Sequence, residues 1–360
     1  MYKLALGAII SLLCVSLPVS AARTHAAGDG PRKSSIKKGK VVPQRHGLRQ
    51  AAPEGQERLV KRVVTVHGKR KVVYQRLITA SVLPRPTMGD LAGLNLTRDP
   101  LDLKSNVAFV LDQDNSEILF EKNANVALPI ASITKMMTGL VVVEANQDMD
   151  ELLTVTEDDV DREKFSRSRL QVGSQLTRAN MLHIALMSSE NRAASALGRN
   201  YPGGLPAFVE AMNAKARALG MVDTHYVDSS GLSKMNVASA RDLAKLAMAA
   251  YRHPRLREYS TDTKAVVESN GHLMHFGTTN RLVSSPGWVI GLQKTGFINE
   301  AGRCMMMQAV IQGRAVIMVL LDAKGAAART ADAGRMRKWL EALKPTALGG
   351  AAAPSYSTGM

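Results

Sequence analysis

Three short strings in the sequence carry side chains that together could perform acyl transfer. They are an S-x-x-K at 132–135, an S-x-N at 189–191 and a K-T-G at 294–296. In that order they supply a hydroxyl with an amine three residues away, a second hydroxyl with an amide, and a cation followed by a third hydroxyl. Such a set is typical of enzymes that form an acyl-serine intermediate with neither histidine nor metal.

The first string lies in a segment that predicts a helix. Pro129 stands just ahead of a largely apolar stretch from Ala131 to Ala145, as at many helix starts. Residues three apart share one face of a helix, so the amine of Lys135 can lie beside the hydroxyl of Ser132. A lysine accepts a serine proton only if burial or a nearby positive charge lowers its pKa. Lys294 is a candidate for that second positive charge.

Each string alone is weak evidence. The S-x-x-K pattern also matches at 34–37 and 35–38, in a basic segment that reads as unstructured. Ser132 and Lys135 alone would read as a polar patch on a helix, and the S-x-N alone as a turn or a helix cap. The K-T-G follows an apolar, strand-like run, where Gly296 would let the substrate backbone approach closely. The order and the context of all three make the combination informative.

The elements around the strings predict an α+β fold with one antiparallel sheet. Apolar runs at 107–111 and 118–120 flank a polar turn, which predicts a hairpin. The middle section, about 150–250, is rich in Ala, Leu and Met at helical spacing and predicts a helical lobe. Strands and a final helix are expected near the end, at 288–293, 304–311, 315–321 and 330–343. Strands at both ends of the domain around a helical middle favour an α+β arrangement.

Positive charge is concentrated near the start of the chain. The 360 residues carry a net charge of +16, and residues 23–80 alone contain 15 Lys/Arg against 3 Asp/Glu. We expect 23–98 to be a basic, largely disordered leader, with a possible small hairpin over 59–80. Two interpretations of this leader stay open: a solvated tether, or a segment with weak attraction for an anionic envelope polymer or lipid face.

The first 22 residues predict a cleaved export signal. A short cationic start precedes the apolar run Leu4 to Val19, and small residues follow it. We therefore expect a periplasmic protein without a transmembrane anchor in its mature form, a location that argues against nucleic acid as a partner. After cleavage Cys304 is the only cysteine, so no internal disulfide is possible. The tail, 346–360, is expected to be flexible.

In its motifs the sequence resembles the low-molecular-mass penicillin-binding proteins, the serine D-alanyl-D-alanine peptidases that share a fold with the serine β-lactamases. The resemblance covers about 100–345 and rests on the strings at 188–194, 292–296 and 300–304. Other members usually carry Gly or Asp where this chain has Glu190, which points to the endopeptidase branch. The resemblance implies a catalytic domain over 99–345, with a five-stranded antiparallel sheet flanked by helices and the site in the cleft beside the helical lobe.

The resemblance also implies a role for each motif residue. Ser132 attacks the carbonyl of a D-alanine, Lys135 takes its proton, and Ser189 relays the proton toward the leaving amine. Asn191 hydrogen-bonds the substrate's backbone-like amide, while Lys294 and Thr295 attract its carboxylate. The backbone N–H groups of Ser132 and Phe297 hold the oxyanion. The residues expected to contact the substrate are thus Asn191, Lys294, Thr295, Gly296 and Phe297.

Three other functions are alternatives for this sequence. A D-alanyl-D-alanine carboxypeptidase would use the same residues and differ only in what the cleft accepts, but such enzymes usually carry a further β domain and a membrane-binding helix, and nothing folded is expected after Leu343. A class A β-lactamase would carry an E-x-x-L-N string between Asn191 and Lys294, and this sequence has none. A wall-binding protein without turnover is the third alternative.

The expected partners are peptidoglycan stem peptides and, as covalent inhibitors, β-lactam antibiotics. No cofactor is expected. His272 and His275 form an H-x-x-H pair, but no third ligand follows at a matching spacing, so a surface role is favoured over a metal site.

Overall fold

The structure is a computed structural model that describes residues 56–66, 69–79 and 85–343. The chain divides into two compact units, Met1–Val82 and Leu83–Met360. In the first unit β1 (Gln56–Val66) pairs antiparallel with β2 (Lys69–Thr79), and Val63 lies opposite Val72. The expected export signal, the extra S-x-x-K matches at 34–38 and the tail from 346 onward lie outside the described residues.

The second unit is built on a five-stranded antiparallel sheet. Its strands are β3 (Ser105–Asp112), β4 (Ile118–Lys122), β11 (Val289–Ile298), β12 (Gly302–Ile311) and β13 (Arg314–Ala323). They lie in the order β11-β12-β13-β3-β4, so strands from the two ends of the domain meet in the middle, where Val319 lies opposite Phe109. The predicted α+β class with a five-stranded sheet is confirmed.

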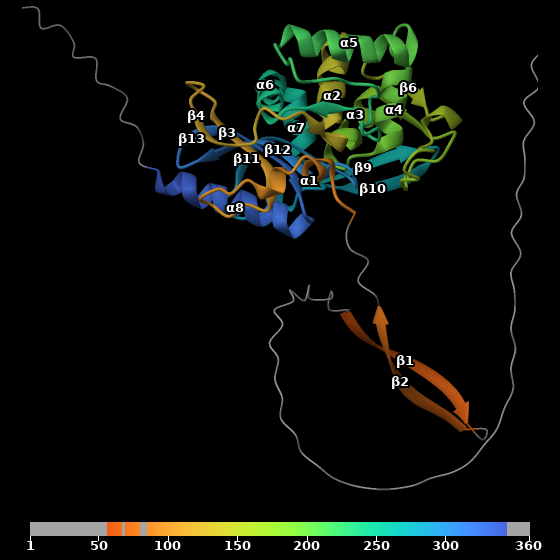
Figure 1. Cartoon of the computed structure of the whole chain (residues 1–360). Coiled ribbons are helices and arrows are strands. Elements are labelled where there is room, and N and C mark those ends of the chain that lie inside the picture. Colours follow the sequence, from red (N-terminus) through yellow and green to blue (C-terminus); the bar gives the residue numbers. More distant parts are fainter. Residues whose placement is uncertain (1–55, 67–68, 80–84, 344–360) are drawn as a thin grey trace, which may run out of the picture. The chain divides into compact units, whose positions relative to one another are not determined.

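Both faces of the sheet are covered, which explains why its central strands carry long runs of apolar residues. Along β3, Val107 and Phe109 belong to the core shared with the helical lobe, whereas Ala108 and Val110 belong to the core under α8 (Ala326–Ala342). Because successive side chains of a strand point to opposite faces, a strand buried on both sides reads as a continuous apolar run. Figure 1 shows α8 on one face and the other long helices on the opposite face.

The helical lobe is built around α2, whose residues from Thr134 to Val142 are all buried. Hydroxyl side chains begin two of its helices: Thr177 accepts a hydrogen bond from the Asn180 N–H and Ser239 accepts one from the Asp242 N–H, as N-cap residues do. The helices are α2 (Thr134–Glu144), α3 (Arg178–Met187), α4 (Asn191–Arg199), α5 (Gly204–Ala218), α6 (Ala240–Tyr251) and α7 (Pro254–Thr261).

Three short two-stranded sheets complete the second unit. They pair β5 (Leu128–Pro129) with β8 (Val237–Ala238), β6 (Leu152–Thr154) with β7 (Gln175–Thr177), and β9 (Lys264–Ser269) with β10 (His272–Gly277). Single 3₁₀ turns occur at Leu94–Leu96, Ala131–Ile133, Glu157–Asp159 and Arg281–Ser284.

Residues ahead of the expected domain start pack onto the body. The short helix α1 (Met88–Leu91) is capped by Thr87, whose hydroxyl donates to the Asp322 carboxylate at 2.7 Å. The Met88 N–H donates to the Glu300 carbonyl at 2.9 Å. Part of the stretch expected to be leader is thus held to β13 and to the β11–β12 turn by hydrogen bonds.

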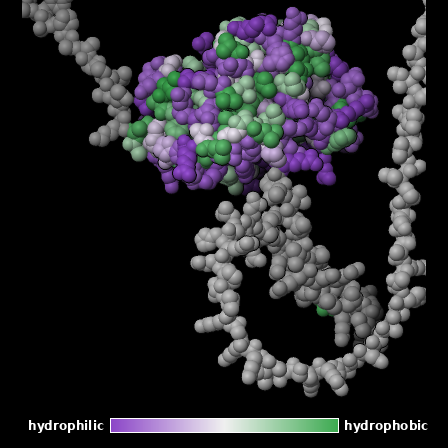
Figure 2. All heavy atoms as spheres, in the orientation of Figure 1, coloured by the Kyte–Doolittle hydropathy of each residue, from purple (hydrophilic) through white to green (hydrophobic). Residues whose placement is uncertain are grey.

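Hydrophilic and hydrophobic residues are interspersed over the face of the second unit seen in Figure 2. Within the described ranges, the chain contains no helix with the length and apolarity needed to cross a bilayer. Cys304 is buried, and burial raises the pKa of its thiol to about 12.

Candidate active site

The candidate nucleophile lies on a tight turn between β5 and α2. Ser132 is the middle residue of the 3₁₀ turn Ala131–Ile133, and Lys135 follows in the first turn of α2. The Lys135 ammonium donates to the Ser132 hydroxyl, with Nζ and Oγ 3.1 Å apart. Ala131 has φ +48°, a left-handed conformation that costs a residue with a side chain about 1–2 kcal/mol. The surrounding packing therefore holds this turn in a strained shape that presents Ser132 to the cleft.

Lys135 is fully buried and bonded to three acceptors. Besides Ser132, its Nζ lies 2.6 Å from the Asn191 Oδ1 and 2.6 Å from the Ser230 carbonyl oxygen. Burial lowers its pKa to about 8, while the carboxylates of Asp228 and Glu190 oppose that shift. An amine with a pKa near 8 can lose its proton at little cost near neutral pH, which an ordinary lysine cannot.

The second and third strings meet through another buried lysine. The Lys294 Nζ donates to the Ser189 Oγ at 2.9 Å and to the Thr295 carbonyl at 3.0 Å. Burial, and then the nearby charge of Lys135, lowers the pKa of Lys294 well below its ordinary value. The expectation that Lys294 keeps Lys135 neutral is therefore incomplete: burial is the main cause for both lysines, and their repulsion disfavours a state in which both are charged.

Gly296 is required by the nucleophile turn. A Cβ at this position would lie 2.7 Å from the Ile130 carbonyl oxygen and 3.1 Å from the Ser132 backbone nitrogen. Because this position has no side chain, β11 lies directly against the turn that carries Ser132. Gly296 also lines the cleft, where the substrate backbone is expected to bind. The next residue, Phe297, is the other candidate donor to an oxyanion.

Asn191 and Ser189 reach the cleft from the bend between α3 and α4. Ser189 has a left-handed backbone, φ +64°. The Asn191 Nδ2 donates to the Ser166 hydroxyl at 2.8 Å while its Oδ1 accepts from Lys135. Both ends of the Asn191 amide are thereby fixed, so its orientation is set before a substrate arrives.

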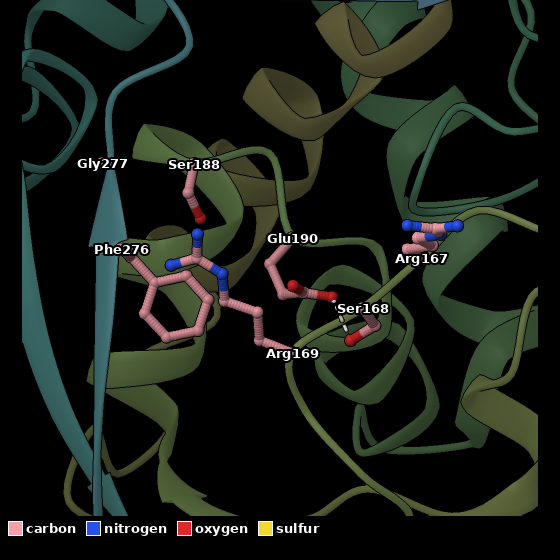
Figure 3. A pocket seen from close by; sticks show the side chains of 7 residues that line it. All are labelled: Arg167, Ser168, Arg169, Ser188, Glu190, Phe276 and Gly277. Carbon is pink, nitrogen blue, oxygen red and sulfur yellow. Dashed lines mark hydrogen bonds between the residues drawn. The ribbon is translucent and has the colours of Figure 1, made fainter. Parts of the chain in front are cut away.

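Glu190, between these two residues, lies in a different hollow. Its carboxylate accepts from the Ser168 hydroxyl at 2.6 Å and from the Arg192 N–H at the start of α4. Figure 3 shows this contact in a pocket of about 450 Å³, with Arg169 extending between Phe276 and Ser188. Glu190 thus caps α4 and ties the loop 161–170 to the second string.

The structure brings all eight expected residues together. A cleft of about 300 Å³ is lined by Ser132, Ser189, Asn191, Thr295, Gly296 and Phe297. Lys135 and Lys294 lie buried beneath it, bonded to the two serines. At the cleft wall, the Thr295 hydroxyl is 2.7 Å from that of Thr279.

Sequence reasoning missed Arg329, which also lines the cleft. This residue of α8 is 7% exposed; its Nη1 donates to the Cys304 carbonyl at 3.0 Å, and its Nε has no hydrogen-bond partner among the described residues. Burial lowers its pKa, and the charge of Arg303 adds to the effect. A buried guanidinium with an unused donor suits an incoming carboxylate. No local pattern distinguishes it, because it joins the site only when α8 packs beside β12.

Within the described ranges no group of three or more His, Cys, Asp and Glu side chains is placed to hold a metal ion. His272 and His275 lie exposed on β10, and neither lines the catalytic cleft.

Comparisons of sequence and of structure both find similar proteins among enzymes that act on D-alanyl-D-alanine peptides or are named DD-transpeptidases. Residues 95–325 match the family described as D-alanyl-D-alanine carboxypeptidase, Peptidase S11. A D-alanyl-D-alanine endopeptidase of Pseudomonas aeruginosa is 45% identical over 263 residues, which cover 72% of this chain and 84% of that protein. A D-alanyl-D-alanine endopeptidase of Escherichia coli is 41% identical over 245 residues, covering 68% and 79%. The crystal structure of the Streptomyces K15 DD-transpeptidase superimposes with a TM-score of 0.64 at 26% identity, covering 69% of this chain and all of that one.

Proposed function

The chain belongs to the Peptidase S11 family of D-alanyl-D-alanine peptidases, as its motifs predicted, and from this premise we propose that it is a serine endopeptidase that cleaves D-alanyl–diaminopimelate cross-links of peptidoglycan. Its similarity to two endopeptidases over most of their length carries the proposal. The predicted export signal would place the enzyme in the periplasm, where this substrate lies.

Acylation begins with the carbonyl of the donor D-alanine above Ser132. The Ser132 Oγ attacks the carbonyl carbon, and its proton passes to the Lys135 Nζ, 3.1 Å away. Negative charge develops on the carbonyl oxygen, which accepts hydrogen bonds from the backbone N–H groups of Ser132 and Phe297. Because Gly296 holds β11 against the nucleophile turn, these two donors are fixed in place before the reaction, and they stabilise the transition state without reorganising.

The substrate carboxylate prepares Lys135 for this step. It binds beside Thr295 and Arg329, close to Lys294, and its negative charge favours the protonated form of that lysine. A charged Lys294 then repels a proton on Lys135. Substrate binding thus favours the neutral amine that acts as the base.

The leaving amine receives its proton through Ser189. The Ser189 hydroxyl donates to the nitrogen of the scissile bond as the carbon–nitrogen bond breaks, and it regains a proton from the Lys294 ammonium, whose Nζ lies 2.9 Å away. The proton that Lys135 took from Ser132 then leaves one positive charge on the pair of lysines, as before the reaction. The acceptor peptide leaves as a free amine, and the donor stays as an ester on Ser132. Water then attacks the ester carbonyl and releases the carboxylate product.

β-Lactams enter the same reaction and stop at the ester. Opening of the lactam ring acylates Ser132, but the amine remains tethered and continues to block the cleft. None of the side chains that line the cleft within the described residues is a carboxylate that could activate water. We therefore propose that penicillin forms a long-lived covalent adduct and that the chain is not a β-lactamase.

A carboxypeptidase is the second candidate, because the family description itself names that activity. Incubation of the purified protein with cross-linked muropeptide dimer and with monomeric pentapeptide separates the two. Monomers released from the dimer, with the pentapeptide intact, support the endopeptidase. Loss of terminal alanine alone moves the assignment to the carboxypeptidase. If the protein cleaves neither substrate and penicillin does not label it, the proposal that it is an enzyme is refuted.

A further inference from the structure

A second pocket adjoins the catalytic cleft on the side of α1 and the β11–β12 turn. It measures about 500 Å³, and its lining includes Arg85, Thr87, Phe297, Asn299, Arg303 and Lys324. Phe297 and Arg303 also line the catalytic cleft, so the two hollows share a wall. At this wall the Arg303 guanidinium carbon lies 3.7 Å from the centre of the Phe297 ring. Phe297 is 46% exposed, which leaves an aromatic surface open at the junction.

The charges around this second pocket are unbalanced. Asp90 is the only carboxylate in its lining. Asp90 is already engaged: it lies 2.8 Å from the Lys324 Nζ and accepts from the side-chain amide of Asn106. Neither Arg85 nor Arg303 forms an ion pair within the part of the chain that the structure describes. Two unneutralised guanidinium groups in one hollow favour a ligand that carries carboxylates.

The position of the pocket says which part of the substrate reaches it. The carboxylate of the leaving residue is placed beside Thr295 and Arg329, so the leaving group lies at the Arg329 side of Ser132. In a pentapeptide the leaving residue is alanine, whose side chain is only a methyl group. In a cross-link it is the D-centre of diaminopimelate, whose side chain continues into a whole acceptor stem with further carboxylates. The Glu190 pocket, by contrast, shares no lining residue with the catalytic cleft.

We propose that the pocket bounded by Arg85, Arg303 and Phe297 binds the acceptor stem peptide of the cross-link. The inference rests on the endopeptidase function proposed above and adds the feature that selects a cross-linked substrate over a pentapeptide. Apolar stem atoms cover Phe297, and the stem carboxylates pair with the two arginines. A leaving alanine is too short to reach this pocket and gains nothing from it.

Arg85→Glu tests the proposal, with Arg217→Glu as a control of equal charge change. Arg85 lines the second pocket but not the catalytic cleft, whereas Arg217 is exposed on α5 in the helical lobe. Both are made in the full-length mature chain, with and without Ser132→Ala. Calorimetry with the Ser132→Ala proteins measures binding of cross-linked dimer and of pentapeptide, and the active proteins give kcat/KM on dimer and the rate of penicillin acylation.

We expect Arg85→Glu to weaken dimer binding and lower kcat/KM on dimer by about tenfold or more, as loss of a charge-assisted contact does. Pentapeptide binding and penicillin acylation should change less than twofold, and Arg217→Glu should match the parent in every measurement. The proposal is overturned if Arg85→Glu and Arg217→Glu bind the dimer equally well. It is also overturned if Arg85→Glu loses pentapeptide binding and penicillin acylation as much as it loses dimer binding. If the unmutated protein does not cleave the dimer but Arg85→Glu still weakens dimer binding, the endopeptidase function is refuted and the proposed binding pocket is supported.

Discussion

Gly296→Ala tests the idea that β11 must lie directly against the nucleophile turn. The added methyl group would lie 2.7 Å from the Ile130 carbonyl oxygen and 3.1 Å from both the Ala131 Cβ and the Ser132 nitrogen. Ordinary contacts between heavy atoms need roughly 3.5 Å, so strand and turn must separate by half an ångström or more. Neither side can yield by rotating a side chain, because the nearest atom is backbone.

The expected cost follows from that geometry. Overpacking of this kind lowers the free energy of unfolding by about 1–3 kcal/mol, and each kcal/mol lowers Tm by roughly 2–4 °C in a domain of this size. The same separation moves the Phe297 N–H away from the oxyanion, and a displacement near 1 Å can cost about 100-fold in rate. Stopped-flow acylation with a fluorescent penicillin and thermal unfolding measure the two effects.

Gly334→Ala is the matched control, since a Cβ there meets no atom within 4 Å and the residue lies inside α8. It should acylate at the wild-type rate and unfold at the same Tm or slightly higher, because alanine favours a helix over glycine. Wild-type acylation by Gly296→Ala at an unchanged Tm would refute the reasoning, since it would mean that strand and turn are not in rigid contact.

Three further outcomes are expected. Ser132→Ala should take no covalent penicillin label in a denaturing gel while keeping the wild-type Tm, and a persistent label would assign the nucleophile elsewhere. Acylation by penicillin should rise with pH along a limb near pH 8, because burial lowers the pKa of Lys135 to about that value and only its neutral form accepts the Ser132 proton; a flat profile between pH 6 and 9 would exclude Lys135 as the base. Arg329→Gln should lower kcat/KM on substrates with a free carboxylate by about 10- to 100-fold but hardly affect carboxamide analogues, and equal losses on both would show a merely structural role.

Much of the fold follows from local patterns. The two-sided burial of β3, β12 and β13 makes them largely apolar, so the mainly apolar runs at 107–111, 304–311 and 315–321 identify strands. Helix ends were harder to predict: α8 begins at Ala326 rather than near residue 330, because Gly325, which precedes it, has no side chain that could cap the helix and mark its start. Local pattern does not distinguish the segment around α1 from the leader, because hydrogen bonds between residues more than 200 positions apart hold it to the body.

The sequence by itself determined the chemistry, because S-x-x-K, S-x-N and K-T-G each supply reactive groups at fixed local spacing. It could not say that Glu190 faces away from the cleft to cap α4. Only the tertiary structure decided which groups meet. Burial of Lys135 and Lys294, the need for glycine at 296, and the recruitment of Arg329 and Arg303 all depend on contacts between distant segments. Desolvation and close packing arise only when those segments come together, and no local pattern encodes them.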